Sequence, residues 1–123
     1  MKYSSEIDKT NEICTVHVTG KFTRPHDGDE LKRFAVDTFT NHGCRRFLID
    51  LTDAQVRGGT MPTFDAGNPK GEIVNSLRRL KAAFVRHELT EEDRFLETVA
   101  VNRGFSVRAF DTCEKAVDWL TQS

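Results

Sequence analysis

A glycine pair flanked by an arginine could form an anion site. Gly58 and Gly59 lie between Arg57 and Thr60. If a helix opens there, the backbone N–H groups of Gly59 and Thr60 would point toward an anion at the positive end of the helix dipole. Arg24 or Arg57 could add charge and a directed pair of N–H donors, so a phosphate or carboxylate would fit. The alternative interpretation is that the glycines form a simple turn and that the arginines are solvated.

A second group of residues could serve acid–base or metal chemistry. His26 and His87 lie in predicted loops, next to Asp27 and Glu88. A pocket that held Asp53 together with both imidazoles would suit either role. The spacing does not match a zinc site, and the alternative is a pair of surface histidines. The sequence also lacks a phosphate loop with its lysine and a paired nucleophile and base. We therefore expect no enzyme, no cofactor and no metal.

The cysteines point to a reducing compartment. Cys14, Cys44 and Cys113 are odd in number and far apart, which fits reduced thiols better than a disulfide framework or a metal site. Cys14 and Cys113 are expected in the core. No apolar stretch follows a basic leader, and nowhere do about 18 apolar residues run together. We expect a cytoplasmic protein without a membrane span.

Size and charge restrict the class of protein. The 123 residues fit one domain, and a hydrophobic fraction of 37% with nine Phe supports a packed core. The net charge of −1 argues against nucleic-acid binding, which needs a basic face.

Hydrophobic periodicity predicts the elements that must position these residues. The predicted strands cover residues 2–8, 13–19, 47–51, 82–85 and 105–110. The predicted helices begin near Asp27, Glu72, Thr90 and Asp111, with Asp93 completing a capping box at Thr90. Helical crossovers imply parallel central strands, and the first hairpin adds an antiparallel member. The predicted fold is one α/β domain, residues 1–123, with a mixed, mostly parallel sheet of about five strands and about four helices.

The chemistry-bearing residues gather on the predicted loops. Residues 52–71 are expected to be irregular because glycines and prolines interrupt them, and such segments usually carry function. The carboxyl ends of parallel strands meet at one edge of a sheet, so residues of three crossovers should become neighbours there. They are Thr23, Arg24, His26 and Asp27; then Thr52, Asp53, Arg57, Gly58, Gly59 and Thr60; then Arg86, His87 and Glu88. Phe22, Met61 and Phe64 near the same edge could close the core or line an apolar pocket.

Three features carry a resemblance to a known family. They are the initial hairpin, the strand 47–53 leading into Gly58-Gly59-Thr60, and the pattern from Phe95 to Leu120 with Asn102-Arg103-Gly104 before the last strand. In order and spacing the chain resembles the STAS-like domains, the SpoIIAA-like group typified by bacterial anti-sigma-factor antagonists, and their small STAS/SEC14-like relatives. The resemblance spans nearly the whole chain. It implies helices packed mainly on one side of a mixed sheet, no cofactor, no catalysis, and function by docking a partner or a small ligand.

The resemblance also bears on Thr60. In the antagonists, a serine at the start of the helix after the third strand is phosphorylated by a partner kinase, and Thr60 is the nearest hydroxyl here. The alternative role of Thr60 is that of a helix N-cap. The segment from Arg57 to Thr60 departs from the acidic-serine-serine-glycine pattern of the family.

Two hypotheses about function follow. The first is a non-enzymatic regulatory or scaffolding domain that binds a protein partner through the loop and helix start after the third strand, Arg57 to Phe64. The alternative is a small-ligand module with a pocket under the broken helix 60–80, where Arg24 or Arg57 would hold the acidic head of an anionic or lipid-like ligand. An exposed edge strand would also allow a homodimer.

Overall fold

The fold is a five-stranded sheet whose strands lie in chain order. The computed structural model describes residues 1–24, 26–58 and 71–122, with the backbone alone for Arg24, Gly58 and residues 71–74. The antiparallel pair β1 (Lys2–Asp8) and β2 (Ile13–Arg24) is followed by β3 (Arg46–Gly58), β4 (Lys81–Val85) and β5 (Ser106–Phe110), each parallel to its predecessor. The prediction of a mixed, mostly parallel sheet is confirmed.

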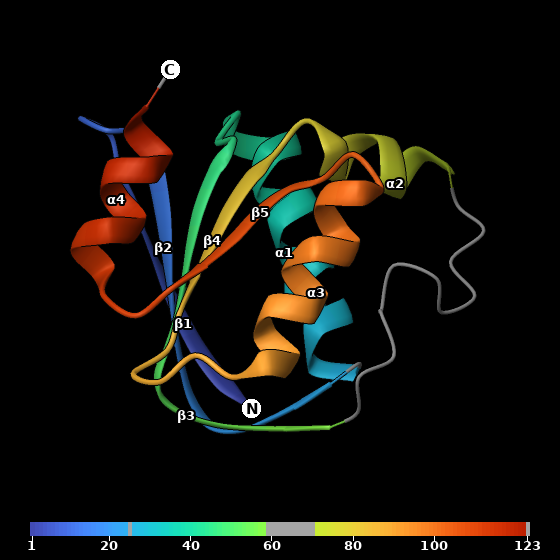
Figure 1. Cartoon of the computed structure of the whole chain (residues 1–123). Helices are drawn as coiled ribbons and strands as arrows, with labels where there is room; N and C mark the ends of the chain where they lie inside the picture. The colour runs from blue at the N-terminus through green and yellow to red at the C-terminus, as the bar shows by residue number, and fades with distance from the viewer. Residues whose placement is uncertain (25, 59–70, 123) are drawn as a thin grey trace.

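Three helices cover one face of the sheet and one covers the other (Figure 1). Each parallel strand is added on the same side of the previous one, so right-handed crossovers place α1 (His26–His42), α2 (Gly71–Arg78) and α3 (Glu91–Asn102) together. The last helix, α4 (Cys113–Thr121), follows β5 and packs on the opposite face. None of the helices in the described ranges is long and apolar enough to span a bilayer.

The core has two layers because strand side chains alternate between the two faces. Cys14, Val16 and Val18 are fully buried under α1, as their spacing predicts. On the other face, Leu48 and its neighbours pack against α4. Apolar residues at alternate positions of a strand therefore pack on opposite faces of the sheet, one set beneath α1 and the other beneath α4.

The ends of α3 and α4 are fixed by side-chain caps. The Thr90 hydroxyl accepts from Asp93 N and the Asp93 carboxylate accepts from Thr90 N, which confirms the predicted capping box. For α4 the prediction was wrong: the cap is Thr112, whose hydroxyl accepts from Lys115 N, rather than Asp111. Cys113 is then the first residue of the helix and is exposed, so its predicted place in the core is also wrong.

The strand β3 is much longer than expected. Residues 52–58 continue it, although the sequence prediction made them irregular. The β4 strand pairs with β3 only as far as Asp50, and beyond that point, within the described ranges, β3 pairs with β2 alone. Residues 19–24 of β2 and 53–58 of β3 therefore form a two-stranded extension, which we call the arm.

The arm begins at an irregularity. Between His17 and Thr19 the register shifts, so that one additional residue of β3 lies between the partners Asp50 and Asp53. Gly20 follows directly with a positive φ of 79°, a conformation that favours glycine. A bulge of this kind bends the bulged strand and increases its twist. Figure 1 shows both strands turning sharply at this level and running under α1.

Candidate functional site

The arm brings two of the three predicted crossovers together. Thr23 pairs with Arg57 and Arg24 with Gly58 in the parallel register. Thr23 N donates to Asp27 Oδ2 at 2.8 Å, which ties the end of β2 to the first turn of α1. The end of the arm is therefore a fixed surface formed by two strands and the start of a helix.

The two faces of the arm differ in chemistry. Phe22, Ala54 and Val56 pack against the core beneath α1. Lys21, Thr23, Gln55 and Arg57 are exposed and lie on the opposite face. The arm thus presents a polar surface with two cations while its other side is anchored by apolar contacts.

The third crossover does not reach this surface. Val85, the last residue of β4, pairs with Asp50, and Arg57 lies seven positions further along β3, roughly 23 Å of strand at about 3.3 Å per residue. His87 and Glu88 follow Val85 and are exposed there, so the expected meeting of all three crossovers is wrong. The physical reason is the unequal length of the strands. Because β4 has five residues and β3 has thirteen, their carboxyl ends do not lie at the same level.

The other predicted rim residues have separate positions. His26 is the exposed first residue of α1. Arg86 donates to both carboxylate oxygens of Asp93 at 2.7 Å, so its side chain is paired with α3 and does not lie at the end of the arm. In the part of the chain that the structure describes, no group of three or more His, Cys, Asp and Glu side chains is placed to hold a metal ion.

A cluster that the sequence interpretation missed lies at the base of the arm. His17 Nδ1 is 3.2 Å from Asp50 Oδ2, and His17 Nε2 is 2.9 Å from Asp53 Oδ2. The Thr52 hydroxyl and backbone N–H both donate to Asp50 Oδ1, at 2.6 and 3.0 Å. The bulge makes this possible, because the additional residue turns Asp50 and Asp53 to the same face as His17. The signal in the sequence was an outward-facing His on one strand and the pattern Asp-x-x-Asp, Asp50 to Asp53, in the neighbouring strand.

The electrostatics of this cluster depend on protonation. Burial alone would raise the pKa of Asp50, but hydrogen bonds from Thr52 and the contact with His17 hold it below its usual value. A neutral imidazole donates at one nitrogen only, whereas the imidazolium donates at both. Both carboxylate contacts of His17 are therefore favourable together only when the ring is charged. The cluster clamps β2 to β3 at the bend of the arm.

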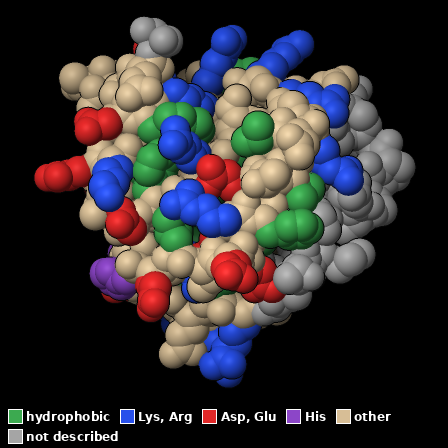
Figure 2. All heavy atoms as spheres, viewed as in Figure 1, with side chains coloured by type: hydrophobic (Ala, Val, Ile, Leu, Met, Phe, Trp, Pro, Cys, Tyr) green, Lys and Arg blue, Asp and Glu red, His purple; other side chains and the backbone are tan. Residues whose placement is uncertain are grey.

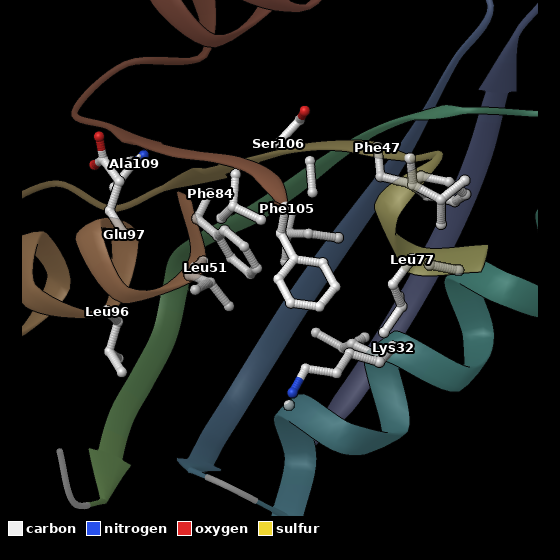
Figure 3. A pocket seen from close by; sticks show the side chains of 18 of the residues that line it. Lys32, Phe47, Leu51, Leu77, Phe84, Leu96, Glu97, Phe105, Ser106 and Ala109 are labelled. Atoms are coloured by element: carbon white, nitrogen blue, oxygen red, sulfur yellow. Dashed lines mark hydrogen bonds between the residues drawn. The ribbon is translucent and has the colours of Figure 1, made fainter. Parts of the chain in front are cut away.

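A cavity lies on the face of the sheet that α1, α2 and α3 cover, between these three helices (Figure 3). Its volume is about 160 Å³. The walls are mainly apolar and include Phe22, Leu31, Ile49, Leu51, Leu77 and Leu96. An apolar wall of this kind with a few polar groups is typical of a site for a small molecule.

The charged groups around the cavity differ from those predicted. The lining includes Lys32, Arg86, Asp93 and Glu97, whereas Arg57 is not among the described residues that line it. The wall includes Leu77 of α2, which belongs to the span 60–80 where the sequence predicts a pocket; residues 60–70 of that span lie outside the described residues. The expectation that Arg24 or Arg57 holds the head group of a ligand stays a prediction, because the side chain of Arg24 is not described. Lys32 is a cation that does lie in the lining of the cavity.

Several predicted site residues lie outside the described residues. They are Gly59, Thr60, Met61 and Phe64. The anion site at Gly59 and Thr60 and the phosphorylation of Thr60 stay predictions.

The outer surface over α3, β5 and α4 is mixed. Figure 2 shows hydrophobic side chains there in small separate patches among charged ones. Phe95 and Val101 of α3 are 50% and 54% exposed. Small separate patches of this kind are normal on the surface of a monomer, so we assign no function to them.

Comparisons with known proteins add information on the fold. No protein-family model and no curated protein matches the sequence. The unphosphorylated anti-sigma factor antagonist SpoIIAA aligns with a TM-score of 0.53 and 10% identity, over 99% of this chain and 100% of that chain. An anti-sigma factor antagonist from Mycobacterium paratuberculosis gives 0.54 and 13%, over 98% and 96%. An uncharacterized protein from Shewanella loihica with a SpoIIAA-like fold gives 0.58 and 15%, over 97% and 92%. The chain has the SpoIIAA-like α/β fold of the STAS domains.

Proposed function

We propose that this chain is a non-enzymatic regulatory domain that binds a protein partner through the end of the arm and the segment that follows it, Arg57 to Phe64. The observation that carries the proposal is the length of the arm. Beyond Asp50, in the described ranges, β3 pairs with β2 alone, so the arm offers a further strand edge and an exposed polar face. Strand edges and polar loops on rigid scaffolds are common docking surfaces.

The charge on the arm suggests the character of the partner. Lys21 and Arg57 are exposed on its outer face. A partner surface that carries carboxylates would be steered toward these cations and oriented by the guanidinium of Arg57. The anti-sigma factor antagonists that share the fold support a regulatory role.

The experiment is affinity capture from the source cell with matched variants. The tests are replacement of residues 56–64 by an inert linker and the single reversal Arg57→Glu. The control is Lys9→Glu, an equal charge reversal in the turn between β1 and β2. We expect the replacement and Arg57→Glu to lose the partner that the native chain and Lys9→Glu retain. Equal capture of that partner by all four proteins would refute the proposal.

Two further expectations can be tested on the same material. Intact-mass analysis of the chain purified from its source would show a phosphate on Thr60 as an added mass that Thr60→Val removes. The strands at the two sheet edges are β1, with every residue exposed, and β5. Pairing of two copies through such an edge would give a homodimer, which sedimentation equilibrium would detect.

The cavity favours a second candidate function, the binding of a small ligand. Its apolar wall suits an apolar ligand, and its volume of about 160 Å³ is below the roughly 300–1,000 Å³ typical of pockets for drug-sized molecules, so the ligand would be small. A thermal-shift screen would test this function, because a ligand that binds the folded chain raises its melting temperature. No response across acyl, aromatic and phosphorylated compounds would count against it.

A further inference from the structure

We infer that the cavity between α1 and α3 binds a small amphiphile, with an apolar body about the size of one ring or a short alkyl chain and a carboxylate beside Lys32. The inference rests on the second candidate function and names the class of ligand. It does not depend on the docking of a protein at the arm.

The size of the apolar body follows from the cavity volume. The cavity has about 160 Å³. An engineered cavity of about 150 Å³ in another protein, lined by Leu, Ile and Phe, stays dry and binds benzene. The wall here has the same character, with Leu31, Ile49, Leu51 and Leu77. A single ring or a chain of about six carbons is therefore the expected occupant.

The position of Lys32 suggests the head group. Its side chain is 18% exposed and lies along the wall of the cavity (Figure 3). Its ammonium is 3.4 Å from Asp29, a carboxylate that is 41% exposed. Burial lowers the pKa of Lys32, and the charge of Asp29 partly opposes that effect. A ligand carboxylate at this place would form a charge-assisted hydrogen bond with the ammonium, whereas a ligand amine would be repelled.

The other charged groups of the lining already have strong partners. Arg86 binds both oxygens of Asp93 at 2.7 Å, and that carboxylate also accepts from Thr90 N. Glu97 accepts from Ala109 N and from Arg94 Nη1, each at 3.2 Å. These contacts keep Arg86 and Glu97 in place. The Lys32 ammonium also has partners, Asp29 among them, and with three N–H donors it can share one with a ligand carboxylate.

The test compares three probes with one alkyl chain: hexanoate, hexan-1-ol and hexylamine. Titrations are followed by the methyl NMR signals of Leu31, Leu51, Leu77 and Leu96. Leu120 is the internal control, because it is buried on the opposite face of the sheet under α4. We expect shifts at the four cavity leucines and none at Leu120. We expect hexanoate to bind about tenfold more tightly than hexan-1-ol, the value of one hydrogen bond to a charged group.

Three variants separate the possible results. Lys32→Met should reduce the preference for hexanoate to less than about twofold. Arg33→Met, an exposed neighbour on α1, is the matched control and should keep it. Ala35→Phe should fill the cavity and abolish binding without lowering the melting temperature, which would show that the chain still folds.

Each contrary result has its own meaning. No shift with any probe would overturn both the inference and the second candidate function. Equal affinity for hexanoate and hexan-1-ol, or an undiminished preference in Lys32→Met, would overturn the class of ligand and leave a pocket for neutral compounds. Binding that survives in an Ala35→Phe chain of unchanged melting temperature would place the probe elsewhere and overturn the inference.

Discussion

His17 and Asp50 face each other across β2 and β3, with His17 Nδ1 3.2 Å from Asp50 Oδ2. The pair lies where the register shifts and the arm begins. Hydrogen bonds from Thr52 fix the Asp50 carboxylate, which in turn orients the imidazole. This relationship connects a protonation equilibrium to the part of the sheet from which the arm projects.

The first prediction concerns pH. The pKa of Asp50 is lowered in the folded chain. Its contribution to stability is therefore present above the unfolded pKa of about 3.9 and is lost as the pH falls through the lower folded pKa. Asp50→Asn should reduce the free energy of unfolding at pH 7 by about 1–2 kcal/mol, because the Thr52 donors and His17 would face a neutral amide in place of a charged acceptor.

Urea titrations at several pH values check this prediction. The difference between the native chain and Asp50→Asn should shrink as the pH falls below about 4. Asp53→Asn is the control, since the side chain of Asp53 is 61% exposed and its removal should have a smaller effect. A difference that stays constant down to pH 2 would contradict the assigned role of Asp50.

The second prediction concerns the buried ion pair between Arg86, the residue after β4, and Asp93 of α3. Asp93 is 5% exposed and accepts from Arg86 and from Thr90 N. Asp93→Ala should lower the free energy of unfolding by about 3–5 kcal/mol, because a charged partner and a helix cap are lost together. Denaturant unfolding measures this loss. Asp111→Ala removes a surface pair with Lys115 and should leave the melting temperature almost unchanged.

The third prediction concerns the bend of the arm. Gly20 has a φ of 79°, in which a side chain with a Cβ is strained, so Gly20→Ala should destabilise the chain by about 1–2 kcal/mol. Gly28→Ala is the matched control, because Gly28 lies in α1 and a Cβ there would lie 4.0 Å from Phe22 Cζ, an ordinary van der Waals contact. The control should be neutral or stabilising by up to about 1 kcal/mol. Thermal unfolding of both variants distinguishes them, and equal effects would argue against strain at Gly20.

The fourth prediction concerns the thiols. Burial, with a smaller effect of Cys44, raises the pKa of Cys14 to about 11. Cys14 and Cys44 are buried, whereas Cys113 is exposed at the start of α4. A thiol reagent at pH 8 should therefore modify Cys113 first, and Cys113→Ser should remove the fast phase. Rapid labelling of Cys14 in the native chain, detected by peptide mass, would be incompatible with this packing.

Much of the fold could be predicted because local signals agreed with the tertiary structure. The alternation of Cys14, Val16 and Val18 gave the buried face of β2, and Thr90 with Asp93 gave the start of α3. The length of β3 could not be predicted in this way. After Leu51 a bulge reverses which residues of β3 face the core. Ala54 and Val56 therefore face inward, although strict alternation would place them outward.

The site was harder to predict than the fold. Sequence order alone does not give the relative lengths of neighbouring strands, and β4 has five residues where β3 has thirteen. Arg57 and Thr23 were correctly placed together, but His87 was not. The contacts of His17 depend on the same bulge, and the cation at the cavity comes from α1, not from the strand ends.

Hydrogen exchange of the chain with and without its captured partner tests the proposed docking surface most directly. We predict that the partner slows exchange of backbone amides in residues 53–58 and leaves β1, the edge strand that β2 separates from β3, unchanged. Slowed exchange confined to β1 or α4, with residues 53–58 unaffected, would contradict the proposal that the arm is the docking surface.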